Sequence, residues 1–435
     1  MPRQRSDIRV VHRTDIRGTI HGQVLSSSSA IALGSRRTSY ALASAAVVLL
    51  SVGAALVVVL ARELATPIVA GTHLDFLAFY ASGRLVLDHD PAGLYVASAI
   101  TAIERTIIAV PVGANGYMPF INPPFAAVAL APFASLAAQL ARVAWAGLSV
   151  LALIGASIWV AWPLAGRQRI AAALLVGVSF PAYHALAEGQ SSAVLLLGGI
   201  AALQAARVGS WRLAGLALAT FWLKPQLIVL PLLALAVDRR WAAIAWALLG
   251  GGALVVASLP FVGIGSYATY LGYLVGVGMS HFNGAGAVGQ SVWAGALGSL
   301  EGLNGLLVDV FGQGSIVVVD VLWAILVAGL LGVWLLASRL QRPGFDSPAA
   351  RQMLAAGIGI VLLVDPNLFA QDCLLVFLLV PALWPATRAD YWRVVVAIAV
   401  IGALAALPAH LFTIALLAVV LVWCARPIAA AHFTR

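Results

Sequence analysis

A single carboxylate, Asp75, lies in a short apolar stretch that is rich in aromatic residues. Phe76, Phe79 and Tyr80 follow it at the i, i+3 and i+4 spacing of one helix face. Such a helix could lie in a membrane interface. A carboxylate held against an aromatic surface loses water, so its pKa rises and it can act as a general base. The alternative is that Asp75 caps the N-terminus of the same helix.

The only lysine of the chain, Lys224, lies inside an apolar run directly before Pro225 and Gln226. A charge in such a run needs a partner or an anionic ligand. The ammonium group is a compact point charge that suits a phosphate. The alternative is a lysine at a helix break whose ammonium group reaches out to water.

Other motifs that carry chemistry are missing from the sequence. It has no P-loop, no glycine-rich dinucleotide fingerprint and no Cys/His zinc pattern, so neither a metal nor a cofactor is expected. The two cysteines, Cys373 and Cys424, lie in apolar runs and suggest no disulfide framework.

Composition identifies the kind of scaffold that must position these residues. Only 9% of the 435 residues are charged, 62% are hydrophobic, and the mean hydropathy is +1.00. A soluble domain carries roughly 25% charged residues, so a water-soluble globule, a nucleic-acid binder and a disordered chain are excluded. Uncharged runs near the length of a membrane span recur, which predicts an all-α polytopic membrane protein.

Arginine placement predicts the topology. Outside the N-terminal tail, most arginines lie in short connectors, and short basic connectors stay in the cytoplasm. Both termini should then be cytoplasmic, and the loops 62–120 and 264–314 should lie outside. Ten spans are expected: 40–61, 143–160, 170–187, 191–206, 242–263, 315–338, 352–364, 373–387, 394–409 and 411–425.

Two further apolar pieces, 123–138 and 213–237, decide the number of crossings. The first is short and proline-rich, and the second is split by Lys224 and Pro225. If both are re-entrant, about ten crossings result and every basic connector faces the cytoplasm, which the arginine distribution favours. If both cross, about twelve result and the segment 167–212 faces outside.

Three regions follow from this topology. Residues 1–38 should form a disordered basic cytoplasmic tail, because they contain seven arginines and only two aspartates. Residues 39–428 should form a single transmembrane domain, and 429–435 a short cytoplasmic tail. Asp75 follows the first span by few residues, so it should lie just above the bilayer.

Polar side chains gather on the expected outer face. Many of them lie at the ends of apolar runs, where a carboxylate is costly unless it is paired or functional. Any one of them could be an ordinary loop or capping residue, but the set suggests a site because the rest of the chain has so few such groups. The set is Asp75, Asp88, Asp90, Glu104, Asn122, Glu188, Gln190, His281, Asn283, Gln290, Glu301, Asp365, Asn367, Gln371 and Asp372.

The order of these motifs resembles glycosyltransferase family 87, integral-membrane enzymes of the GT-C class. The likeness covers about residues 72 to 385. It consists of Asp75-Phe76, Tyr80-Ala-Ser-Gly83, Asp90-Pro91 and Leu94-Tyr95 in the first outer loop, then Phe120-Ile-Asn-Pro123-Pro124, Gly189-Gln190-Ser-Ser, Leu223-Lys224-Pro225-Gln226, Gln290-Ser291-Val-Trp293 and Asp365-Pro-Asn-Leu-Phe-Ala-Gln-Asp372. Asn122 replaces a tyrosine of the family pattern, Ser192 an asparagine and Asp365 a serine.

The resemblance implies a GT-C-like bundle of ten to twelve helices with interfacial helices in the first outer loop. It also implies transfer of a sugar, mannose in the best-known members, from a polyprenyl-phosphate donor to a lipid or glycan acceptor on the outer face of the cytoplasmic membrane. Asp75 would be the base in an inverting displacement, and no metal would be needed. The implied donor-phosphate residues are Lys224 and Arg84, and the implied substrate-binding residues are His73, Tyr80, Asn122, Gln190, Gln290 and Asp372.

Two other functions stay open. A transporter or flippase for a lipid-linked or small polar solute needs polar groups at the membrane midplane on broken helices, which Lys224-Pro225 and Asp320 could supply. Most carboxylates are expected outside, however, and no internal repeat is visible. A structural membrane protein would not need the outer carboxylate set.

Overall fold

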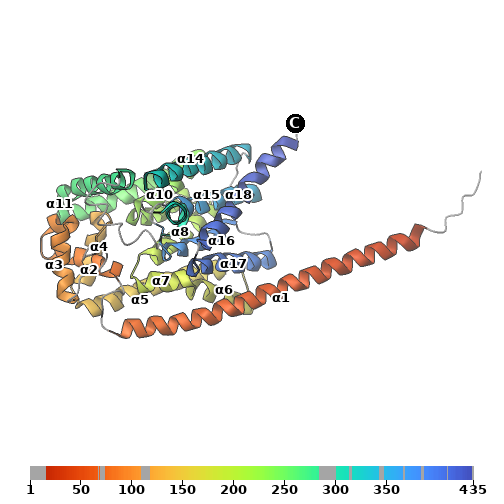
Figure 1. Ribbon diagram of the computed structural model, residues 1–435, viewed down its shortest axis with the longest axis horizontal. Coiled ribbons are helices and arrows are strands. Elements are labelled where there is room, and N and C mark those ends of the chain that lie inside the picture. The colour runs from red at the N-terminus through yellow and green to blue at the C-terminus, as the bar shows by residue number, and fades with distance from the viewer. Residues whose placement is uncertain are drawn as a thin grey trace, which may run out of the picture. The chain divides into compact units, whose positions relative to one another are not determined.

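The computed structural model describes residues 16–66, 68, 74–108, 118–283, 300–312, 316–341, 347–365, 368–383, 387–408 and 410–433. By its contacts the chain divides into two units, Met1–Val48 and Leu49–Arg435. The second unit carries every site residue discussed below. Figure 1 labels helices of this unit from α2 to α18.

Every regular element within these residues is a helix, which confirms the all-α expectation. The larger α-helices are α1 (Ile16–Ala65), α5 (Ala138–Ala161), α8 (Ser192–Arg207), α11 (Trp241–Asn283), α14 (Ile316–Gln341), α15 (Pro348–Val364), α17 (Arg388–Ala403) and α18 (Leu411–Phe433). The shorter ones are α2 (Leu74–Leu87), α3 (Ala97–Ile107), α4 (Pro124–Ala134), α6 (Gly166–Gly177), α7 (Phe180–Ala187), α9 (Trp211–Leu218), α10 (Pro225–Val237), α13 (Gly302–Phe311) and α16 (Leu379–Leu383). The 3₁₀ helices are η1 (Pro91–Tyr95), η2 (Ala219–Leu223), η5 (Asp372–Leu378) and η6 (Leu404–Ala406).

Long apolar helices confirm a polytopic membrane protein. Within the described residues, five stretches are long and apolar enough to cross a bilayer, or six if the bent pair α6 and α7 counts as one span. The five are Tyr40–Ala65, Ala138–Ala161, Trp241–Leu274, Val317–Leu340 and Arg388–Ala406. Eight further apolar helices are shorter, so the number of crossings stays a prediction.

Helices reach into both segments that the sequence predicts to be tails, and the domain boundaries stay predictions. Residues 1–38 are expected to be disordered, yet α1 already begins at Ile16. Residues 1–15 lie outside the described part. At the other end, α18 continues to Phe433, through most of the expected 429–435 tail.

Short helices occupy the two segments that the sequence predicts to be re-entrant. α4 has 11 residues and contains Pro132, so it is about 17 Å long, well short of a bilayer core of roughly 30 Å. The 213–237 segment is broken into α9, η2 and α10, and Lys224 is the non-helical residue between the last two. Both findings agree with segments that do not simply cross.

Several helices begin where the sequence supplies a capping side chain. Ser179, Ser347 and Thr387 precede α7, α15 and α17, and each side-chain oxygen accepts a hydrogen bond from a backbone N–H three residues later. The distances are 3.3, 3.0 and 3.1 Å. These caps satisfy N–H groups that have no partner within their own helix.

The segment that follows α1 packs into an aromatic core. α2 lies along α4, and Gly83 permits this contact because a Cβ atom there would come within 2.8 Å of the Ala134 Cβ atom. The buried ring of Phe79 makes edge-to-face contacts with the rings of Phe120 and Trp145, whose centroids lie 6.5 and 6.3 Å from its own. This core holds α2, the helix that carries Asp75.

The two expected outer loops contact each other. α11 bends at Gly263, whose φ is 67°, and its last part packs on η1 in the first loop. Ser266 Oγ donates a hydrogen bond to the Pro91 carbonyl at 3.3 Å. The Tyr95 ring lies 5.6 Å from that of Tyr270 and 5.4 Å from that of Tyr273.

Candidate active site

Asp75 lies in the first turn of α2, one residue after the helix begins, and therefore is not the capping residue. Its Oδ2 atom accepts a hydrogen bond of 2.6 Å from Gln190 Nε2 and a longer one of 3.4 Å from Gln371 Nε2. Burial raises the pKa of Asp75, although the Gln190 hydrogen bond and the charge of Lys224 partly oppose this. The carboxylate therefore has amide donors but no direct cationic partner among the described residues.

The backbone around Gly189 brings Gln190 to Asp75. Phe76 N donates to the Glu188 carbonyl at 2.9 Å, and Trp145 Nε1 donates to the Gly189 carbonyl at 2.5 Å. Gly189 has a φ of +73°, and a Cβ atom on it would come within 2.7 Å of the Phe76 Cβ atom. Only glycine fits both the left-handed conformation and this close approach.

Lys224 and Asp372 form an ion pair beside Asp75. Lys224 Nζ lies 2.6 Å from Asp372 Oδ1, and the two side chains are only 11% and 1% exposed. Ser192 Oγ donates to the same Asp372 oxygen at 2.6 Å. Lys224 and Asp372 are also the two charged groups that act on Asp75, so all three residues belong to one site.

The break that presents Lys224 is itself held by hydrogen bonds. Asn122 Nδ2 donates to the Leu223 carbonyl at 2.9 Å, and Tyr95 OH donates to the Asn122 carbonyl at 2.8 Å. Asn122 thus satisfies a carbonyl that the helix break leaves without a helical partner. Asn122 therefore stabilises the backbone next to Lys224.

Gln190 keeps one polar atom for a ligand. Its amide nitrogen is used by Asp75, but its Oε1 atom is buried and has no hydrogen-bond partner within the described structure. An unsatisfied buried acceptor is costly in a native protein. It could accept a hydrogen bond from a substrate hydroxyl.

The structure brings together four of the residues that the sequence singles out, Asp75, Gln190, Lys224 and Asp372, and places Asn122 next to them. Sequence reasoning did not assign roles to Ser192 and Gln371, although both stand in the quoted motifs. Their contacts with Asp372 and Asp75 join helices that are far apart in the sequence.

The other sequence-predicted residues lie elsewhere. Arg84 forms an i,i+4 ion pair of 2.7 Å with Asp88, and both side chains are exposed. Tyr80 OH donates to the Leu136 carbonyl at 3.0 Å and so fixes α2 to the turn after α4. His73 and Gln290 lie outside the described residues.

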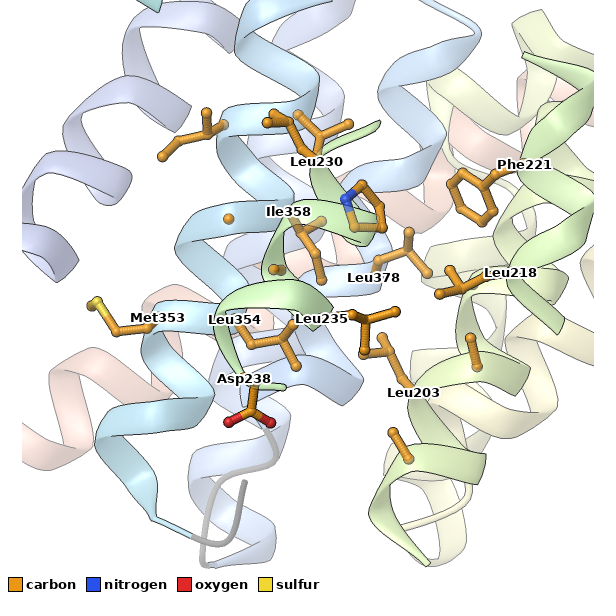
Figure 2. A pocket seen from close by; sticks show the side chains of 18 of the residues that line it. Leu203, Leu218, Phe221, Leu230, Leu235, Asp238, Met353, Leu354, Ile358 and Leu378 are labelled. Atoms are coloured by element: carbon orange, nitrogen blue, oxygen red, sulfur yellow. The ribbon is translucent and has the colours of Figure 1, made fainter. Parts of the chain in front are cut away.

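An apolar cavity of about 150 Å³ begins about one helical turn along the chain from each partner of the ion pair. Leu227 and Leu375, each three residues after Lys224 or Asp372, line one end of it. Its walls come from α8, α9, η2, α10, α14, α15 and η5. In Figure 2 the side chains of Leu203, Leu235 and Leu354 converge on this space, and Asp238 lies at the end away from Phe221 and Leu230.

Comparison with known proteins gives one match. The family model of glycosyltransferase family 87 matches residues 120–366, which is more than half of the chain. This range includes Asn122, Gln190 and Lys224 but ends before Asp372 and begins after Asp75. No curated protein and no solved structure matches significantly.

Proposed function

Because the chain belongs to glycosyltransferase family 87 and is a membrane glycosyltransferase, we propose that it moves a sugar from a polyprenyl-phosphate donor to a lipid or glycan acceptor. Mannose is the proposed sugar, and the outer face of the cytoplasmic membrane is the proposed place. The observation that carries this proposal is the arrangement of Asp75, held by Gln190, beside the Lys224–Asp372 ion pair.

Asp75 is the proposed base. Its carboxylate removes the proton from an acceptor hydroxyl, whose oxygen attacks the anomeric carbon with inversion. The bond between that carbon and the phosphate oxygen breaks, and polyprenyl phosphate leaves with the bonding electrons. Burial raises the pKa of Asp75, which makes the carboxylate a stronger base. Gln190 Nε2 keeps it oriented.

Lys224 is the proposed phosphate ligand. In the structure its ammonium group is neutralised by Asp372, and a bound phosphate would offer it a second anion at the same place. The charge of Lys224 would then stabilise the leaving phosphate as negative charge develops on it. Because that leaving group is a phosphomonoester and not a diphosphate, one ammonium group supplies the counter-charge that the reaction needs.

The apolar cavity supports a lipid donor. Its lining is almost wholly hydrocarbon, and it begins about one helical turn along the chain from the residue proposed to bind the phosphate. A prenyl chain attached to a phosphate at Lys224 would have an apolar path between the helices. Arg84, paired with Asp88, could take part only if that exposed pair opened.

The test is transfer of label by the purified protein. The protein is incubated with polyprenyl-phosphate-[14C]mannose and membrane lipids in vesicles. Label recovered on a new lipid or glycan supports the proposal. Label that crosses the bilayer still attached to its donor would show a flippase instead and would overturn it.

A further inference from the structure

The apolar cavity has a defined length. It follows α10 from Leu227, three residues after Lys224, to Asp238, the first residue after that helix. The 13 residues of α10 correspond to about 20 Å. The opposite wall runs along α15 from Leu362 to Ala350. The cavity is therefore a channel about one helix long, and the proposed phosphate site lies at one end.

The far end holds a polar group, which we call the floor: Trp211 and Asp238 line the cavity, and Arg240 contacts both of them. Arg240 Nε donates to Asp238 Oδ2 at 2.6 Å, and the Arg240 guanidinium carbon lies 4.1 Å from the centre of the Trp211 ring. Figure 2 shows the Asp238 carboxylate at this end, below the apolar side chains.

A hydrocarbon chain cannot extend past these polar side chains without an unfavourable change in free energy. Pushing a methyl branch between Arg240 and Asp238 would separate a partly buried ion pair, which prenyl groups cannot solvate. The Arg240 guanidinium also lies over the Trp211 ring, a cation–π contact that helps to fix the position of the ring. A chain longer than the cavity must leave it sideways into the lipid.

We propose that this cavity measures the donor's isoprene units nearest the phosphate, and that the Trp211–Arg240–Asp238 floor sets the limit at about four units. Each unit adds four bonds to the main chain, about 5 Å when extended, so four fill the channel. The inference rests on the proposed function, because it takes the donor to be a prenyl phosphate. It adds a rule of specificity: units beyond the fourth do not improve recognition.

The gain per unit comes from packing. A prenyl chain in a bilayer is already in an apolar solvent, so transfer to the cavity removes little apolar surface from water. What improves is contact with ordered side chains, an effect that we expect to give about a tenfold rise in kcat/KM between two and four units. Beyond four units kcat/KM should not rise further.

The experiment uses the full-length purified protein and mannosyl donors with two, four, seven and eleven isoprene units. Three variants accompany the unmodified enzyme. Ala234→Phe fills the lower part of the cavity, and Trp211→Ala removes part of the floor. Val229→Phe is the matched control, because it adds the same ring to α10 on a side chain that is 60% exposed and outside the lining.

In the unmodified enzyme and in Val229→Phe, kcat/KM should rise about tenfold from two to four units and then level off. Ala234→Phe should bring the four-unit donor down to the level of the two-unit donor. Trp211→Ala should let the rise continue to seven units. A curve that rises steadily to eleven units, or is flat from two to four, would overturn the inference.

A second measurement separates this inference from the proposed function. Binding of the sugar-free prenyl phosphates of the same four lengths is measured by quenching of tryptophan fluorescence, which needs no catalysis. If no donor gives transfer but binding levels off at four units, the length rule stands and the proposed reaction is wrong. If transfer occurs and neither curve has a break, the length rule alone is wrong.

Discussion

Lys224 and Asp372 are 148 positions apart in the sequence, yet their Nζ and Oδ1 atoms lie 2.6 Å apart inside the protein. Asp372 is almost fully buried, so Lys224 is its main compensation for the loss of water, together with Ser192 Oγ. Lys224, the proposed ligand of the donor phosphate, therefore also stabilises the fold. The two roles must be separated by experiment.

Replacing Lys224 with Met should have two effects. Loss of one charged hydrogen bond should weaken donor binding by about 1.5 to 3 kcal/mol. Loss of the partner of buried Asp372 should lower the free energy of unfolding by about 3 to 5 kcal/mol. Donor affinity and a melting curve in detergent measure the two separately.

The double variant Lys224→Met/Asp372→Asn is the control for the second effect. It removes the unpaired carboxylate, so the melting temperature should recover towards that of the unmodified protein while donor binding stays weak. Lys224→Arg should restore binding only in part, because the planar guanidinium differs from a point charge. Normal donor binding by Lys224→Met would show that this lysine serves structure alone.

The sequence predicts much of the fold because the membrane imposes it. Uncharged runs identify the long helices, and proline positions identify α4 and the break before α10. Asp75 and Lys224 stand out because charges are rare in such a chain. Their residue types and apolar surroundings were sufficient to single them out.

Contacts between distant segments could not be predicted in the same way. The Arg84–Asp88 pair is different, because an i,i+4 spacing at the end of α2 already makes the two residues neighbours. Ser192 and Gln371 act on carboxylates 180 and 296 positions away, and only the packing of α8 and η5 brings them there. The apolar cavity likewise depends on seven elements at once.

Gly189→Ala should disturb the site through the backbone. The φ of +73° opposes any side chain, and the new methyl group would collide with the Phe76 Cβ atom. We expect a loss of about 1 to 3 kcal/mol in the free energy of unfolding and a clear loss of transfer, because Gln190 can no longer reach Asp75.

Gly209→Ala is the matched control for that variant. Gly209 has nearly the same φ, +75°, but a Cβ atom there would meet nothing within 4 Å. It should show similar backbone strain with little loss of transfer. If both variants kept full transfer per folded molecule, the contact between the 188–190 turn and α2 would not matter for catalysis.

Single cysteines should report the topology. The native Cys373 and Cys424 are buried, so background labelling by an impermeant thiol reagent should be low. Cysteines at Ala92, which is exposed on η1, and at Gly284 should react in intact spheroplasts. Protection of both until lysis would reverse the predicted orientation.

A cysteine at exposed Gln168 should separate the two crossing numbers. With about ten crossings this residue faces the cytoplasm and should react only after lysis. With about twelve it faces outside and should react in intact spheroplasts. Labelling of this cysteine therefore distinguishes ten from twelve crossings, which the helix lengths alone do not.

Replacing Asp75 with Asn should separate catalysis from stability. Asparagine keeps the shape of the side chain but cannot take a proton, so transfer should fall by at least ~10²-fold while donor binding changes only a few-fold. Asp75→Glu should recover little, because an extra methylene displaces the carboxylate. Asp88→Asn and Asp90→Asn are the controls, since Asp88 is exposed and paired with Arg84, and they should cost far less.

The raised pKa of Asp75 fixes the sign of two pH effects. The folded protein holds the Asp75 proton more tightly than the unfolded chain, so the stability that Asp75 contributes is present below pH 3.8 and is lost as pH rises through the folded pKa. At neutral pH the buried charge is destabilising, and Asp75→Asn should melt no lower than the unmodified protein. Transfer should show the opposite trend: kcat/KM should fall as pH drops through the same raised pKa, because a protonated base is inactive. An Asp75→Asn enzyme with normal transfer would sink the assignment, and Asp372 would be the next carboxylate to test.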